Sequence, residues 1–327
     1  MKEFRHLLPG LLVSLALVAA ILYFVDLKNV WLAMQRADYR PLALGVALSI
    51  LWLFVRALVW RTLLREKASY GAVFTSMNEG YLLNNFLPFR LGEVGRAFLL
   101  SRKSDLKFAE ILPTIVIERV TDLAFTAAIF LAAIPFVVNA GGAAQVAIFV
   151  GAAVVIGLGG MYLLARNQRW ALDVFHRFSV RWPVIQRAGG SLLEAFLSGL
   201  GILTDGGLFL RFLALMTLDW GIAIVQYTLF VMAFYPQASL LWGMFGLGAT
   251  AFGGAIPSLP GGVGTLEGAL GGALTLLSGD ADTALAVALT WRALNYLTTG
   301  IFGFYALARE GQTIGGMYRE LMKVKSQ

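Results

Sequence analysis

Polar and charged side chains gather in one segment that a transmembrane helix would normally keep apolar, NNFLPFRLGEVGRAFLL at residues 84–100. Such groups are costly in hydrocarbon and usually face a cavity or one another. The pattern predicts a polar path whose guanidinium groups would meet an anionic phosphate. The alternative is that the arginines snorkel at an interface and the glutamate pairs with one of them. The residues concerned are Asn84, Asn85, Arg90, Glu93 and Arg96.

A second cluster lies in IERVTDLAF, residues 117–125. Glu118 and Asp122 are four residues apart, so a helix places both on one face, with Arg119 beside them. Together they are expected either to line a polar path or to form a solvated helix start near the positive end of the helix dipole. An enzyme would use such carboxylates, or Glu93, as general acid and base.

The third segment is AIPSLPGGVGTLEGAL at residues 255–270, where Pro257 and Pro260 break a helix. A helix that begins near Thr265 would aim free backbone N–H groups and a positive dipole end at an anion. The glycines that would expose these amides are Gly261, Gly262 and Gly264.

Glu267 is the only charged residue between positions 220 and 279. A carboxylate there needs a partner, and Arg292 in the next apolar stretch is the natural candidate. The pair is expected either to serve structure alone or to belong to the polar path. Arg56 and Asp219 are lone charges near predicted interfaces, and we expect both to act as anchors.

The first and third segments share the spacing P-x-x-x-G-x-V-G, which begins at Pro88 with Gly92 and again at Pro257 with Gly261. Two readings are open. The spacing marks an inverted repeat of the kind that transporters use, with halves at about 1–165 and 166–327, or its glycines only permit close helix packing.

The composition places these segments in a bilayer. The 327 residues are 58% hydrophobic and 14% charged, with a mean hydropathy of +0.75, whereas soluble domains carry about 25% charged residues. The net charge of +7 is spread between apolar stretches, which favours anionic lipid over nucleic acid as the partner. The absence of cysteine and the two distant histidines predict no metal site. No cofactor is expected, and no ATP-binding P-loop motif is present.

Hydropathy predicts an all-α polytopic transmembrane helical bundle, a single integral membrane domain over 1–327, with about six full spans and two re-entrant or broken-helix hairpins. The full spans are expected at 7–25, 41–60, two between 123 and 165, 212–234 and 283–308. The hairpins are expected at 70–89 and 240–278, entering from opposite faces. The distribution of Lys and Arg predicts cytoplasmic N- and C-termini, outer turns at Asn139, Pro236 and Asp280, and a cytoplasmic or interfacial segment at 166–208.

The strings NNFLPFRLGEVGRA, ERVTDL, PSLPGGVGTLEGAL and ALTWRALNY follow one another between residues 84 and 303. In this order they resemble the transmembrane region of lysylphosphatidylglycerol synthases, a flippase-like membrane family, and PGGVGTLEG is the most specific element. The resemblance implies a bacterial-type inner (plasma) membrane and movement of a phospholipid or a related lipid-linked headgroup between leaflets. Full synthases append a soluble aminoacyl-transferase domain, which this sequence lacks, so headgroup lysylation is not expected. The matching positions are Pro88, Arg90, Gly92, Glu93, Arg119, Asp122, Pro260, Gly261, Gly262, Gly264, Glu267 and Arg292.

Three functions therefore stand beside one another. The first is a lipid transporter, driven downhill, by a partner, or by an ion or proton through Glu93, Glu267 or Asp122. The second is an integral-membrane enzyme acting on a lipid-linked substrate. The third is a non-catalytic partner of a membrane glycosyltransferase or lipid synthase, and either a partner enzyme or a second copy of the chain is a candidate for association.

Overall fold

The computed structural model describes residues 26–86, 91–137, 162–179, 200–256 and 260–309, with a few single positions between 151 and 200. Each element within these residues is an α-helix or a short 3-10 helix, which confirms the predicted all-α class. The predicted first span at 7–25 and the turn at Asn139 lie outside the described residues, as do most of the span that follows this turn and the C-terminal tail.

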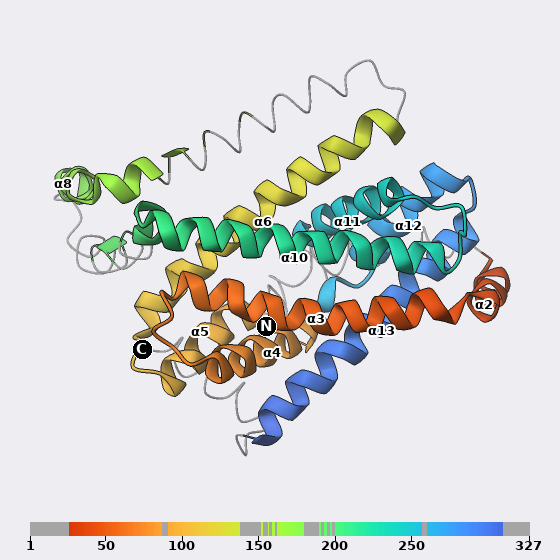
Figure 1. The fold of residues 1–327 in the computed structure, drawn as a ribbon, viewed down its shortest axis with the longest axis horizontal. Coiled ribbons are helices and arrows are strands. Elements are labelled where there is room, and N and C mark those ends of the chain that lie inside the picture. Colours follow the sequence, from red (N-terminus) through yellow and green to blue (C-terminus); the bar gives the residue numbers. More distant parts are fainter. Residues whose placement is uncertain are drawn as a thin grey trace, which may run out of the picture.

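Four long helices carry the fold: α3 (Tyr39–Leu63), α6 (Phe108–Val137), α10 (Gly206–Met232) and α13 (Ala281–Arg309). Helices of 25 to 30 residues are about 37 Å long or more, against a bilayer core of about 30 Å. Within the described residues, α3 and α10 are long and apolar enough to cross a membrane. They run antiparallel and side by side (Figure 1), with Gln226 of α10 donating to Ser49 of α3 over 2.5 Å.

The first hairpin extends beyond its predicted bounds of 70–89, because its returning arm is a helix of its own: it consists of α4 (Tyr70–Phe86) and α5 (Leu91–Lys103). Helices of 17 and 13 residues are about 26 and 20 Å long, too short to cross the core. Gly80 and Gly92 let the two backbones touch, since a Cβ on Gly92 would lie 2.0 Å from the Gly80 carbonyl oxygen. At the base of the hairpin, Lys103 Nζ lies 2.6 Å from Glu79 Oε2, which joins the two arms.

The second predicted hairpin consists of α11 (Leu240–Ala255) and α12 (Thr265–Ser278), with the 3-10 turn η3 (Pro260–Gly262) between them. Gly261, Gly262 and Gly264 have φ of 73°, 72° and 85°, which side chains disfavour, and this sequence of glycines turns the chain back. Both ends of the hairpin lie together, because the Tyr235 hydroxyl before α11 contacts Ser278 Oγ at the end of α12 over 3.2 Å.

The two hairpins enter the bundle from opposite ends, as predicted, and the end of α4 meets η3 inside it (Figure 1). A Cβ on Gly261 of η3 would lie 3.3 Å from the carbonyl oxygen of Asn85 at the end of α4. Asn85 also donates its amide to Thr299 of α13 over 3.2 Å. Broken backbone from two directions is therefore packed against protein in the middle of the bundle, where its polar groups can be satisfied.

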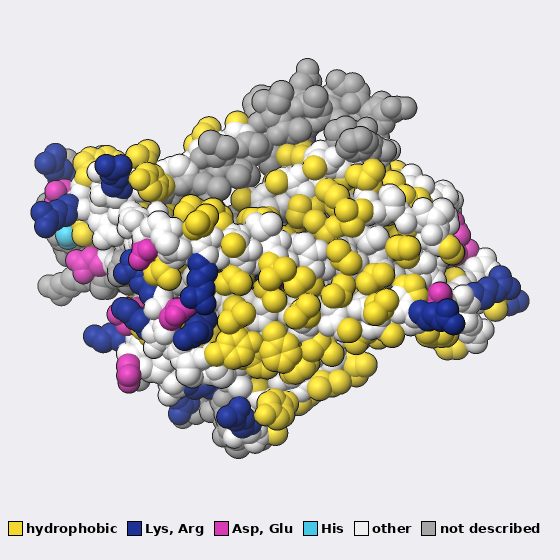
Figure 2. Space-filling model, viewed as in Figure 1, with side chains coloured by type: hydrophobic (Ala, Val, Ile, Leu, Met, Phe, Trp, Pro, Cys, Tyr) yellow, Lys and Arg dark blue, Asp and Glu magenta, His cyan; other side chains and the backbone are white. Residues whose placement is uncertain are grey.

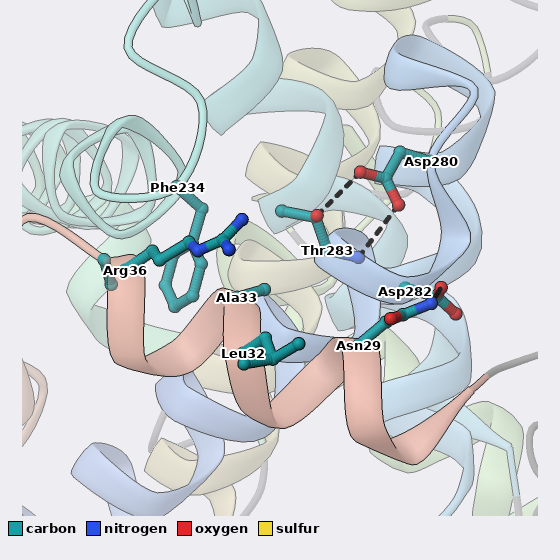
Figure 3. Close-up of a pocket in the computed structure, with 9 residues that line it drawn as sticks. Asn29, Leu32, Ala33, Arg36, Phe234, Asp280, Asp282 and Thr283 are labelled. Carbon is teal, nitrogen blue, oxygen red and sulfur yellow. Dashed lines mark hydrogen bonds between the residues drawn. The ribbon is translucent and has the colours of Figure 1, made fainter.

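A short helix, α2 (Leu27–Arg36), covers the end of the bundle from which α11 and α12 enter. Asp282 in the first turn of α13 holds it, accepting from the Asp26 backbone N–H and the Asn29 amide, each over 2.9 Å. Figure 3 shows Asn29 and Asp282 facing each other across the two helices. The predicted outer loop around α2 and the predicted outer turns at Pro236 and Asp280 thus share one end.

Hydrophobic side chains form a broad belt across the middle of the face that Figure 2 shows. Lys and Arg gather mainly at the end where α8 (Gln168–Ser179), α5 and the start of α10 lie, with a smaller group near α2. A soluble monomer rarely exposes an apolar surface of this extent, so the belt is the surface that faces lipid. Its exposed side chains include Leu44, Leu51, Leu210, Leu218, Leu297 and Ile301.

Candidate functional site

Arg56 lies at the centre of a buried ionic cluster, with 2% of its surface exposed. Its Nη2 contacts Glu118 Oε1 over 2.7 Å, and its Nη1 contacts Asp219 Oδ2 over 3.0 Å. Asp122 accepts from both Nη atoms. The prediction that Arg56 and Asp219 are separate interfacial anchors is wrong, because the antiparallel packing of α3 on α10 pairs them inside the bundle.

Two more arginines complete this cluster around Glu118, which is fully buried. Besides Arg56, Glu118 Oε1 contacts Arg119 Nη2 over 2.6 Å and Arg96 Nη2 over 3.2 Å. Arg96 also contacts Glu93 Oε2 over 2.8 Å. A buried carboxylate without such partners would be strongly destabilising, so the three guanidinium groups account for the presence of Glu118 at this depth.

These contacts decide between readings that the sequence left open. Glu118 and Asp122 do not form a solvated helix start, since α6 begins ten residues before Glu118. Arg96 is 1% exposed and stacks 4.6 Å from the ring of Trp60, so it does not snorkel at an interface. α5, the returning arm of the hairpin, carries Arg96 back into the bundle.

Glu267 and Arg292 pair as predicted, with 3.2 Å between Glu267 Oε1 and Arg292 Nε. Arg292 Nη2 also donates to the Tyr296 hydroxyl over 2.7 Å. The other carboxylate oxygen of Glu267 accepts from the Gly264 backbone N–H over 2.8 Å. The predicted anion site at this helix start is therefore wrong at Gly264, because the chain caps that amide with its own side chain.

The two hairpins place their charges at equivalent positions. Glu93 is the third residue of α5 and Glu267 is the third residue of α12. Each contacts an arginine that is the twelfth residue of the following long helix, Arg119 in α6 and Arg292 in α13. The Glu93 and Arg119 pair is the looser one, at 3.7 Å between Oε1 and Nη1.

A cavity of about 510 Å³ lies against the ionic cluster, between α3, α4, α6, α10, α11 and α13. Its lining includes the charged residues Arg56, Arg119, Asp122 and Asp219. It also includes the aromatic residues Trp52, Tyr81, Trp220, Tyr227 and Trp291. Ionic groups and aromatic rings lie close together, since the Arg56 guanidinium is 5.8 Å from the centre of the Trp52 ring. This mixed, amphipathic lining suits a molecule with a charged part and an apolar part.

The cavity reaches the lipid-facing belt between α6 and α11. Leu123 of α6 and Phe252 of α11 both line it, and they are 56% and 37% exposed. Arg119 is the most accessible of the clustered guanidinium groups, with 35% of its side chain exposed. A ligand entering from the side would therefore meet Arg119 and Asp122 before the deeper residues.

The remaining predicted residues lie around the hairpin tips. Asn84 accepts from the Gly92 backbone N–H over 2.8 Å, which closes the tip of the first hairpin. Gly261 and Gly262 shape the second tip. Pro260 begins η3. Pro88, Arg90 and Pro257 lie outside the described residues. Of the predicted path residues, Arg119 and Asp122 line the cavity directly.

Sequence reasoning missed Arg56 and Asp219 as members of the site. The signal that could have found them is their position as ionisable residues within predicted spans, since such residues are functional by default. It also missed the amide and hydroxyl groups on the cavity wall, such as Gln226, Asn295 and Thr299, which single helices do not distinguish from packing residues.

A second hollow of about 370 Å³ lies at the α2 end (Figure 3). Arg36 extends along its rim, and Asp280 accepts from the backbone N–H and hydroxyl of Thr283 over 3.0 and 2.6 Å. These bonds cap the start of α13, so they explain the acidic groups of the hollow as structural. Among the residues that the structure describes, no group of three or more His, Cys, Asp or Glu side chains is placed to hold a metal ion.

The fold and the site define an integral membrane protein of the all-helical class, with paired hairpins and an amphipathic cavity. The family model for the lysylphosphatidylglycerol synthase TM region matches residues 8–303, and the chain belongs to this family. It is also 25% identical over 300 residues to the glycosyltransferase AglD of Haloferax volcanii, covering 80% of this chain and 47% of AglD. The chain thus spans about half the length of that relative. No solved structure matches the chain.

Proposed function

We propose that the protein moves a phospholipid, or the headgroup of a related lipid-linked molecule, between the two leaflets of its membrane. The observation that carries this proposal is the amphipathic cavity, which is lined by both ionic and aromatic side chains and adjoins the lipid-facing belt between Leu123 and Phe252. A headgroup enters the cavity through this side, while its acyl chains remain in the bilayer.

Arg119 is the first group to meet the phosphate. Its guanidinium contacts Glu118 over 2.6 Å and Asp122 over 3.3 Å, and it is the most exposed of the three clustered arginines. A phosphate competes with Asp122 for the outer N–H groups of Arg119 and forms charge-assisted hydrogen bonds with them. Arg56 also lines the cavity, is more deeply buried than Arg119, and receives the phosphate in the next step.

The two halves of the chain, about 1–165 and 166–327, act as inverted repeats within a single membrane domain. The order of long helix, two hairpin helices and long helix in α3 to α6 recurs in α10 to α13. Repeats of this kind open a central site alternately to the two sides. The pairs Glu93 with Arg119 and Glu267 with Arg292 are at equivalent places to hold one side closed at a time.

The proposal includes an orientation in the plasma (bacterial inner) membrane. The end that carries most Lys and Arg in Figure 2 faces the cytoplasm, in line with the positive-inside rule. The proposal keeps the cytoplasmic N- and C-termini that the same rule predicts from the sequence. The interfacial segment at 166–208, which contains α8, lies against anionic headgroups there.

The decisive test measures leaflet exchange of a fluorescent phospholipid in vesicles that contain the purified protein. We expect exchange with the unmodified protein and at least a tenfold loss in Arg119→Gln. Arg211→Gln is the matched control, because Arg211 pairs with Glu66 at the exposed start of α10 and not with the cluster. Absence of exchange by the folded unmodified protein, with phosphatidylglycerol, phosphatidylethanolamine and polyprenyl-phosphate probes, would overturn the proposal.

A second candidate substrate follows from AglD, whose name describes glycosyl transfer. In this version the headgroup is a lipid-linked sugar, and the chain delivers it to a membrane glycosyltransferase. Mass spectrometry of lipids that co-purify with the protein separates the two versions. Glycosylated polyprenyl lipids would favour delivery to a transferase, and phospholipids enriched over the membrane average would favour the first version.

The enzymatic alternative is disfavoured by the environment of its carboxylates. Glu118 is fully buried and bound by three guanidinium groups, so it has little capacity to accept a proton from a substrate. Glu93 is engaged by Arg96 and Arg119. Recovery of a chemically altered lipid from the vesicle assay would reverse this preference.

A further inference from the structure

We propose that Asp219 is a proton-binding site on the wall of the cavity, and that its proton is transported together with an anionic headgroup. The second half of this statement rests on the proposed transport function, whereas the first half concerns the ionic cluster alone. Neither the cluster geometry nor the proton depends on which lipid occupies the cavity.

The cluster contains more acids than bases. Within the described residues it holds four carboxyl groups and three guanidinium groups: Glu93, Glu118, Asp122 and Asp219 against Arg56, Arg96 and Arg119. With all seven of these described groups ionised, their summed charge is one negative charge inside the bundle. An unpaired buried charge is strongly destabilising, and a carboxyl group in this position is neutralised by a proton.

Asp219 is the carboxyl group with the fewest cationic contacts. Glu118 contacts three guanidinium groups, and Glu93 and Asp122 contact two each. Asp219 contacts Arg56 through Oδ2, and its other oxygen, Oδ1, is buried with no hydrogen-bond partner among the residues that the structure describes. The side chain is 2% exposed and lines the cavity. The proton therefore binds at Asp219 Oδ1.

The surroundings favour a proton over a metal ion. The charged groups that act on Asp219 are Arg56 from α3 and Asp122 and Glu118 from α6, and one of these three is itself a cation. Trp220, the next residue along α10, stacks on Phe125 of α6 with 6.1 Å between ring centroids. Ca²⁺ needs six to eight oxygen ligands and Mg²⁺ an octahedral set, whereas a proton needs one oxygen atom.

Protonation of Asp219 changes what Arg56 can bind. In the ionised cluster, Arg56 is shared among three carboxylates. When a proton from water adds to Asp219 Oδ1, an O–H bond forms, the cluster becomes neutral, and Arg56 keeps two charged partners. Its guanidinium then has charge available for a phosphate at the cavity wall. Loss of the proton restores the third carboxylate and expels the phosphate, so proton and phosphate move in the same direction.

Infrared spectroscopy tests the proton site without any transport. We expect the purified protein in lipid nanodiscs to show the absorption of a protonated carboxyl group that disappears as the pH is raised. The band should be absent in Asp219→Asn, present in Asp219→Glu, and unchanged in the control Asp105→Asn, whose side chain is exposed outside the cluster. Asparagine imitates the neutral acid, so Asp219→Asn should fold and unfold at a temperature no lower than the unmodified protein. A band that persists in Asp219→Asn would overturn the proposal.

A pH gradient across reconstituted vesicles tests the coupling. One proton per headgroup and one pH unit support about a tenfold ratio of an anionic phospholipid between leaflets, since one unit corresponds to a factor of ten. The unmodified protein should approach this ratio, and Asp219→Asn, which has no titratable proton at this position, should give no leaflet ratio that follows the pH gradient. An equal response of both proteins, or a response to sodium in place of protons, would overturn the coupling. Failure of all lipid exchange would instead count against the transport function, and the infrared result would still decide the proton site.

Discussion

Glu93 and Glu267 occupy the same place in two hairpins that enter the bundle from opposite ends. Each is the third residue of the returning helix, and each contacts the twelfth residue of the next long helix, which is an arginine in both cases. The two pairs nevertheless differ in their surroundings. Glu93 belongs to the seven-residue cluster, whereas Glu267 and Arg292 form a separate pair. We infer that the second pair is the simpler one to test.

The first prediction concerns stability at the second hairpin. Arg292→Gln removes the guanidinium from a buried carboxylate, and loss of one partner of a buried ion pair costs about 3–5 kcal/mol in the free energy of unfolding. The double variant Glu267→Gln with Arg292→Gln should recover most of this loss, because no unpaired charge remains. Thermal unfolding in detergent measures both, and Arg211→Gln on the surface should stay within about 1 kcal/mol of the unmodified protein. Equal losses in the single and double variants would contradict the assigned pair.

The second prediction concerns the glycine turn. Gly261 has a φ of 73°, and an added Cβ would lie 2.3 Å from the Tyr296 hydroxyl. Gly261→Ala therefore combines backbone strain of about 1–3 kcal/mol with a steric clash between the hairpin tip and α13. Gly272→Ala, in the middle of α12 with open space around its Cβ position, should instead stabilise the protein by about 0.5–1 kcal/mol. Comparable unfolding temperatures for the two variants would show that the turn is not built as described.

The sequence predicts contacts between charges that stand alone in apolar surroundings. Glu267 has no other charge within its segment, and this isolation indicated Arg292 as its partner. Arg56 and Asp219 also stand alone in their spans, but they are 163 residues apart. Their contact depends on the position of α3 along the axis of α10. The sequence pattern of neither helix determines this relative position.

The sequence contained a signal for the cap at the start of α12 that the prediction did not use. Glu267 lies three residues after Gly264, the spacing at which a carboxylate returns to the helix start. Its contact with the Gly264 N–H could therefore have been predicted. The extent of α5 was harder to predict, because Glu93, Arg96 and Lys103 make the returning arm look like an interfacial segment until their partners on α4 and α6 are known.

The third prediction concerns the orientation of the protein in the membrane. Because the sequence contains no cysteine, a single introduced cysteine is the one thiol that a maleimide can label. Asp105 and Ser239 are both exposed, at opposite ends of the bundle. In intact spheroplasts, a membrane-impermeant maleimide should label Ser239→Cys and leave Asp105→Cys unlabelled until the cells are opened. Labelling in the reverse order would invert the proposed orientation, and labelling of both in intact cells would place the two ends on the same side.

The fourth prediction concerns the cavity. Ala251 of α11 lies on its wall, and Ala251→Trp would fill much of the space beside Phe252. We expect the variant to fold, since a tryptophan at a lipid-accessible cavity replaces contacts with lipid or water, and to lose at least tenfold in leaflet exchange. Leu276→Trp is the matched control, because Leu276 is 73% exposed on α12 and is not part of the cavity lining, so added aromatic volume there meets only lipid. If Ala251→Trp exchanged lipid as fast as Leu276→Trp in vesicles of the same protein content, the path would not run through this cavity, even if Arg119→Gln were inactive.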